Sequence, residues 1–225
     1  ARPLLERALA ILEKSRGPEH PDTAAGLNSL AALMLAQNEP AAARPLLERA
    51  LAIHEKALGP EHPGNATILN NLAAALKGLG DFAAARSRFA RALAITERAH
   101  GPDHPETATS LSNLATTLRA MGDPAAARPM LERALAIQEK ALGRDHPRTA
   151  TTLNNLAGVL QDLGDLRAAR PLGERALALR EKLLGPDHPD TAQSVVNLAL
   201  LLRAIGDLPA ARPLFERVQA TCETK

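Results

Sequence analysis

The dipeptide His-Pro recurs along this chain at a constant interval of 42 residues, and this interval is the strongest constraint on the fold. The copies are His20-Pro21, His62-Pro63, His104-Pro105, His146-Pro147 and His188-Pro189. A fixed interval over a whole chain indicates one structural unit stacked on copies of itself, because a single copy cannot bury its apolar face. The sequence therefore predicts a solenoid that serves as a binding scaffold, not a compact enzyme domain.

Within the unit 63–104, two amphipathic helices are expected on either side of a Gly-Asp turn. The apolar face of the first helix is formed by Ala66, Leu69, Leu72, Ala73 and Leu76. These residues recur at helical spacing. Gly80 suits the left-handed conformation that ends a helix, and Asp81 can cap the next one. In the first unit the turn reads Asn38-Glu39, where Asn still accepts a left-handed backbone and Glu39 places an acid at the helix start.

The repeat predicts a single array over 1–225 that holds eleven helices. A lone second helix in 1–20 precedes five helix pairs, which cover 21–62, 63–104, 105–146, 147–188 and 189–225. The last helix becomes polar, as the final unit of an array requires, so the array is expected to end near Lys225. The first helix presents Leu4, Leu5, Leu9 and Leu12 without a partner helix, and this apolar surface favours self-association.

Composition excludes several classes of function. The net charge of +2 gives no strong attraction to nucleic acid or membrane, and no apolar run approaches the ~20 residues that span a bilayer. Aromatic residues make up only 1% of the chain, so arginines have no neighbouring rings for base stacking. Cys222 is the only cysteine and excludes an internal disulfide. A cytoplasmic protein with no cofactor, no nucleic-acid partner and no membrane contact is expected.

Several longer motifs recur in register and carry a family resemblance. They are Leu-Asn-Asn-Leu-Ala at 69–73 and 153–157, Arg-Ala-Leu-Ala-Ile at 49–53, 91–95 and 133–137, and Gly-Pro-x-His-Pro before the first helices. Over essentially the whole chain these motifs resemble the tetratricopeptide repeat family, and in particular the 42-residue repeats of kinesin light chains. The resemblance implies an all-α, right-handed solenoid of stacked antiparallel helix hairpins. It also implies a non-catalytic protein whose first helices line a concave groove for extended peptides or partner helices.

Polar columns on the first helices supply the candidate groove residues. They are Asn28, Asn70 and Asn154 in one column, Asn71, Asn113, Asn155 and Asn197 in the next, Lys77, Arg119, Gln161 and Arg203 further along the helix, and Thr67, Thr109 and Thr151 on the same side. Asparagine can hold a peptide backbone without reading its side chains. By resemblance the first column faces the groove and the second lies at its edge. The second column either binds ligand or bridges neighbouring repeats by hydrogen bonds to the backbone.

Lys77, Arg119 and Arg203 would form a weakly basic strip that suits an extended, modestly acidic protein or peptide segment. A solvated helix face explains the same residues without a ligand. The alternative function is a regulatory or sensor segment of a larger bacterial signalling ATPase or protease, which docks on an attached domain.

The five repeated histidines do not predict a metal site, because equivalent residues one repeat apart cannot share an ion at bonds of ~2 Å. They are interpreted as residues at helix starts. Gly173 breaks a different column, which otherwise holds Leu47, Phe89, Leu131 and Phe215. The missing side chain predicts a packing defect and a soft joint at the fourth hairpin.

Overall fold

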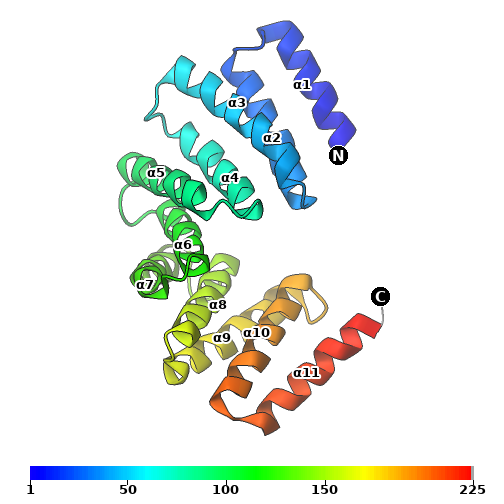
Figure 1. The fold of residues 1–225 in the computed structure, drawn as a ribbon, viewed down its shortest axis with the longest axis vertical. Helices are drawn as coiled ribbons and strands as arrows, with labels where there is room; N and C mark the ends of the chain where they lie inside the picture. The colour runs from blue at the N-terminus through cyan, green and yellow to red at the C-terminus, as the bar shows by residue number, and fades with distance from the viewer. Residues whose placement is uncertain (224–225) are drawn as a thin grey trace. The chain divides into compact units, whose positions relative to one another are not determined.

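The computed structural model describes residues 1–223, which form eleven α-helices joined by short turns (Figure 1). The helices are α1 (Arg2–Arg16), α2 (Pro21–Ala36), α3 (Pro40–Leu58), α4 (Gly64–Gly78), α5 (Phe82–His100), α6 (Pro105–Ala120), α7 (Pro124–Ala141), α8 (Pro147–Asp162), α9 (Leu166–Leu184), α10 (Pro189–Ile205) and α11 (Leu208–Glu223). No strand occurs in this described range, so the expected all-α solenoid of stacked antiparallel hairpins is confirmed. The expected array end at Lys225 lies outside the described residues.

The chain divides into two compact units, Ala1–Pro102 with α1–α5 and a second unit from Asp103 onward with α6–α11. Within each unit, every helix packs against the next one in the chain, as Figure 1 shows. First helices also contact one another: α2 contacts α4, and α8 contacts both α6 and α10. Among the described residues no second helix contacts another second helix in this way. The first helices of a unit therefore lie closest together, on the side where the groove is predicted.

The turn inside each hairpin is left-handed at one residue, as the sequence predicts. The backbone angle φ is 61° at Asn38 and 82° at Gly80. The aspartate that follows the glycine caps the second helix, since Asp81 Oδ1 accepts a hydrogen bond from a first-turn N–H at 3.0 Å. Glu39 holds the equivalent position but makes no capping bond, and its carboxylate pairs instead with Arg2 at 3.1 Å.

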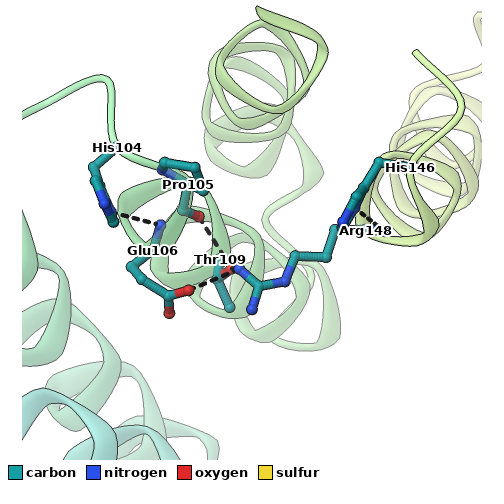
Figure 2. Close-up of polar contacts among 6 residues, drawn as sticks. All are labelled: His104, Pro105, Glu106, Thr109, His146 and Arg148. Atoms are coloured by element: carbon teal, nitrogen blue, oxygen red, sulfur yellow. Dashed lines mark hydrogen bonds and ion pairs between the residues drawn. The ribbon is translucent and has the colours of Figure 1, made fainter. Parts of the chain in front are cut away.

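Each histidine of the His-Pro motif caps a first helix, which confirms its interpretation as a helix-start residue. Nδ1 of His104 accepts the N–H of Glu106 at 3.2 Å, and Nδ1 of His146 accepts the N–H of Arg148 at 3.1 Å (Figure 2). The same bond to the second following residue occurs at His20, His62 and His188. The proline contributes a fixed φ at a position where its missing N–H costs nothing. The motif therefore sets where each hairpin begins.

The loop between successive hairpins is held by side chains from both helices of the later hairpin. Thr149 Oγ1 donates to the carbonyl of Gly143 at 3.1 Å. From the second helix of the later hairpin, Arg175 bonds Glu139 at 2.5 Å and the carbonyl of Arg144 at 3.1 Å. Comparable loop contacts come from Thr23, Asn65 and Thr191, and from Arg49, Arg91 and Arg217. These bonds fix how one hairpin sits on the next.

Replacing His146 with Ala removes one of these caps and should lower the free energy of unfolding by about 1 kcal/mol, because a first-turn N–H loses its partner. Urea denaturation followed by circular dichroism measures the change. His146→Asn, which can accept the same bond, should recover most of the lost stability. Equal stability of His146→Ala and wild type would show that the cap contributes nothing.

Candidate functional site

All fourteen predicted groove residues lie on first helices, and they are divided between the two compact units. The first unit holds Asn28, Thr67, Asn70, Asn71 and Lys77 on α2 and α4, and the second holds Thr109, Asn113, Arg119, Thr151, Asn154, Asn155, Gln161, Asn197 and Arg203 on α6, α8 and α10. The strip formed by Lys77, Arg119 and Arg203 thus draws its members from both units and stays a prediction.

Asparagines of the two neighbouring columns bond to each other across successive hairpins. Asn71 Nδ2 donates to Asn28 Oδ1 at 2.9 Å, and Asn197 Nδ2 donates to Asn154 Oδ1 at 3.1 Å. The second-column residue thus bridges to the preceding hairpin through a side chain, where the sequence suggested a backbone partner. Asn113 and Asn155 make no such side-chain pair in the described structure and line a separate hollow between α6 and α8.

Four of the predicted residues surround one hollow of about 160 Å³, here called the Gly173 hollow. Its polar rim consists of Arg119, Asn154, Gln161, Asp162 and Asn197. Its remaining lining comes from Ala157, Gly158, Gly173, Leu198, Leu200 and Leu201. Three helices of consecutive hairpins, α8, α9 and α10, supply most of these residues, and Arg119 reaches in from α6. The hollow therefore combines an apolar floor with groups that donate and accept hydrogen bonds.

Gly173 lines the floor of the hollow, in a column where other repeats place a large apolar side chain. In the same column Leu47 and Leu131 are fully buried and Phe89 is 3% exposed. A Cβ atom added to Gly173 would meet Leu198 Cδ1 at 3.3 Å and Leu201 Cδ2 at 3.6 Å. Leu198 and Leu201 thus close in on the Cβ position, while a hollow remains beside the glycine. The soft joint expected at the fourth hairpin stays a prediction. The hollow's position beside predicted groove residues was missed, although the broken column was the signal for it.

Arg119 forms one wall of the hollow and already holds a carboxylate. Its Nε and Nη2 atoms donate to the two oxygens of Asp162 at 2.5 and 3.1 Å, in a bidentate pair. Gly158 permits this position, because a Cβ there would lie 2.3 Å from Arg119 Nη1. The guanidinium charge at the rim is therefore largely balanced within the protein.

Two other predicted cations have different surroundings. Burial lowers the pKa of the Lys77 ammonium on α4 below its ordinary value. Arg203 is exposed and borders a hollow beside α11, which Leu208 and Phe215 also line. The three cations expected to form a basic strip therefore differ: Arg119 is paired with a carboxylate, Lys77 is partly buried and Arg203 is exposed.

Sequence reasoning also missed a polar column on the second helices, formed by His54, Thr96, Gln138 and Arg180. Gln138 and Arg180 are 2% and 7% exposed. Arg180 Nη1 donates to the carbonyl of Asp190 at 2.7 Å and to Ser194 Oγ at 2.9 Å. Burial lowers the pKa of the Arg180 guanidinium, and the Asp190 charge opposes this shift. The missed signal is that the column stays polar in a face that is otherwise apolar.

The apolar residues of α1, which the sequence predicts to favour self-association, are partly covered by α2. Leu9 and Leu12 lie near Gly26 of α2, whereas Leu4 and Ile11 are 72% and 57% exposed. Self-association through α1 therefore stays a prediction. Among the side chains of residues 1–219, no cluster of three or more metal-ligating groups occurs. No described helix has the length and apolarity to cross a bilayer.

Comparison with known proteins identifies the repeat. The Tetratricopeptide repeat family model matches residues 1–56, 40–98, 64–140, 111–182 and 148–224. The structure of a putative kinesin light chain of Podosopora anserina with TPR-like repeats is 30% identical, with 91% of this chain and 97% of that chain covered and a TM-score of 0.73. BtubC (BKLC) from P. vanneervenii is 23% identical over 98% of this chain and 87% of its own, with a TM-score of 0.77. Apo RapI is 14% identical over 97% and 89%, with a TM-score of 0.69.

The likeness to BtubC and RapI is one of fold alone, given their low identity. No curated protein matches the chain.

Gly173→Ala should raise the free energy of unfolding by less than about 1 kcal/mol, because alanine favours a helix over glycine. The new Cβ would lie 3.3 Å from Leu198 Cδ1, so the Leu198 side chain has to shift by a few tenths of an ångström and part of the gain is lost. Urea denaturation measures the gain. Gly158→Ala is the matched control and should gain less, since its Cβ displaces Arg119 from Asp162. A loss of stability in Gly173→Ala would mean that the side chains of Leu198 and Leu201 cannot move away from the new methyl group.

Proposed function

The chain belongs to the tetratricopeptide repeat family, whose repeats generally mediate protein–protein interactions, and on this premise we propose that it is a non-catalytic scaffold for an extended peptide segment. The proposed site is the face of α6, α8 and α10 that carries the predicted groove residues. The observation that supports it most is the Gly173 hollow, which lies among four of those residues.

An apolar side chain of the partner is the proposed occupant of the hollow. In other repeats a leucine or phenylalanine of this chain fills the equivalent column, and the fourth repeat leaves that space open. A hollow of about 160 Å³ has room for a side chain of about the size of benzene. Leucine, methionine or phenylalanine of a partner would bury its surface against Leu198 and Leu201 and take the place of the missing repeat side chain.

The rim supplies groups that can hold the partner's backbone on either side of this anchor. Asn154 uses Oδ1 to accept the bond from Asn197, and its Nδ2 group makes no hydrogen bond to another described residue. Gln161 stands on the same helix and offers a second amide. Amide groups can both donate to peptide carbonyls and accept from peptide N–H groups, so an extended segment suits them without reading its sequence.

A modest preference for acidic segments is proposed to come from Arg119 and Arg203. Arg119 shares its guanidinium with Asp162, so an acidic partner residue would compete with an internal carboxylate and gain little. Arg203 is exposed at the next first helix. The apolar anchor is therefore expected to contribute more binding free energy than the charges.

Peptides selected from a random display library against the wild-type protein should carry a leucine, methionine or phenylalanine. Their affinity for Gly173→Leu should be at least about tenfold lower than for wild type, because the new side chain fills the hollow as Leu131 fills its own column. Fluorescence polarisation measures the affinities. Melting curves should show that Gly173→Leu stays folded.

Ala178→Leu provides the control, since it adds the same side chain to an exposed position of the same helix. It should bind the selected peptides like wild type. Equal affinities of wild type and Gly173→Leu, or a selection with no apolar anchor, would contradict the proposed function.

A further inference from the structure

A second hollow, of about 150 Å³, lies between α6 and α8 and shares no lining residue with the Gly173 hollow. We call it the Gln138 hollow. Polar side chains surround it, among them Thr109, Ser112, Gln138, Arg148, Thr152 and Asn155. Where the Gly173 hollow has a leucine floor, this one has no leucine, isoleucine, valine or phenylalanine among its lining residues. Such a lining offers an occupant several hydrogen-bonding groups and no large apolar side chain.

Gln138 reaches the hollow from α7 and is nearly buried, with 2% of its surface exposed. Its Oε1 atom is buried without a hydrogen-bond partner. The other members of its column are satisfied: His54 Nδ1 bonds Asn65 at 2.6 Å, Thr96 donates to a carbonyl, and Arg180 bonds Asp190 and Ser194. Buried polar atoms in folded proteins almost always have a partner, so the exception requires an explanation.

The charged group at the edge of this hollow is already balanced. Arg148 extends from α8 toward α6, where its Nη1 atom lies 2.7 Å from Glu106 and 3.5 Å from Thr109 (Figure 2). Inside the hollow, the hydroxyls of Ser112 and Thr152 are 3.3 Å apart and bond to each other. A charged occupant would lose its water without meeting an unpaired opposite charge, which is costly. The occupant that fits is therefore neutral.

We propose that the Gln138 hollow binds the carboxamide of an asparagine or glutamine side chain from the same partner segment, an inference that rests on the proposed function. A carboxamide carries donors and an acceptor in one plane, and so does Gln138. Rotation about the terminal torsion of Gln138 can present either its oxygen or its nitrogen, because that torsion is soft. Two facing carboxamides then form a pair of complementary hydrogen bonds and satisfy Oε1.

The two hollows also set a spacing on the partner. They lie on either side of α8, and packed helices are separated by about 8–10 Å. Their α8 lining is also offset along the helix, from Thr151 and Thr152 to Ala157 and Gly158, which adds roughly 10 Å at about 1.5 Å per residue. An extended or polyproline-type chain advances about 3.1–3.3 Å per residue. The two offsets combine to about 13–14 Å, so the carboxamide is expected about four residues from the apolar anchor in the peptides selected above. Peptides that keep the anchor but show no asparagine or glutamine near it would overturn this inference and leave the proposed function standing.

A direct test uses N-acetyl-L-glutamine N-methylamide as the probe, titrated into ¹⁵N-labelled protein. A ligand of this size is expected to bind with a Kd of about 1 mM. The side-chain amide signals of Gln138 should shift on binding. N-acetyl-L-norleucine N-methylamide, which has no carboxamide side chain, should leave them in place, and equal shifts from both probes would refute the assignment.

Gln138→Met keeps the length of the side chain and removes its polar atoms. This variant should melt at a higher temperature than wild type, because an unsatisfied buried oxygen is gone, and it should bind the probe at least tenfold more weakly. Gln37→Met, at an exposed glutamine of the first unit, is the control and should bind like wild type. Unchanged probe binding by Gln138→Met would mean that the probe binds without the Gln138 amide, and it would overturn the proposal. Gly173→Leu should bind the probe like wild type, because it changes only the Gly173 hollow. Probe binding therefore tests the amide site separately from the peptide selection, which tests the proposed function.

Discussion

Close approach of helices at alanine is the constraint on which the stacked architecture depends. Two alanine columns run along the second helices, and members such as Ala43, Ala50, Ala127 and Ala134 have no exposed surface. The distance between packed helices follows from the size of the side chains between them. A larger residue at these positions would push the second helix of that repeat outward. The packing angle between this hairpin and the next one would then change. The columns are therefore a geometric requirement, and the leucines around them fill the space that this geometry leaves.

The loops convert this packing into a regular array, because they fix each hairpin by bonds from its neighbours. His146 determines where α8 begins, Thr149 holds the preceding loop, and Arg175 of the later hairpin bonds both Glu139 and the carbonyl of Arg144. The net contribution of each exposed bond is small. Their common effect is to hold the first helices side by side within a unit, which is what gives polar side chains on α6, α8 and α10 a shared surface.

Local features of this fold could be predicted from sequence, and long-range contacts could not. The left-handed turn at Asn38, the aspartate caps and the histidine caps depend on residues within a few positions of each other, so the repeat motif reveals them. The pairing of Arg119 with Asp162 joins residues 43 positions apart and needs Gly158 to make room. Sequence patterns place these residues on one face but do not say which partner an arginine chooses. The glycine at 173 was visible as a broken column, yet only the positions of Leu198 and Leu201 decide whether the gap collapses or stays open.

A perfectly regular array would offer the same chemistry in every repeat and could not distinguish one segment of a partner from another. Specificity has to come from positions where a repeat departs from its own pattern. The second unit has two such departures in consecutive hairpins, a missing apolar side chain at Gly173 and an unsatisfied amide at Gln138. Each is unfavourable for folding by itself, since one leaves a cavity and the other a buried oxygen without a partner. In the proposed binding mode both disadvantages are removed by the same event, the arrival of a chain that carries an apolar side chain and a carboxamide at matching positions.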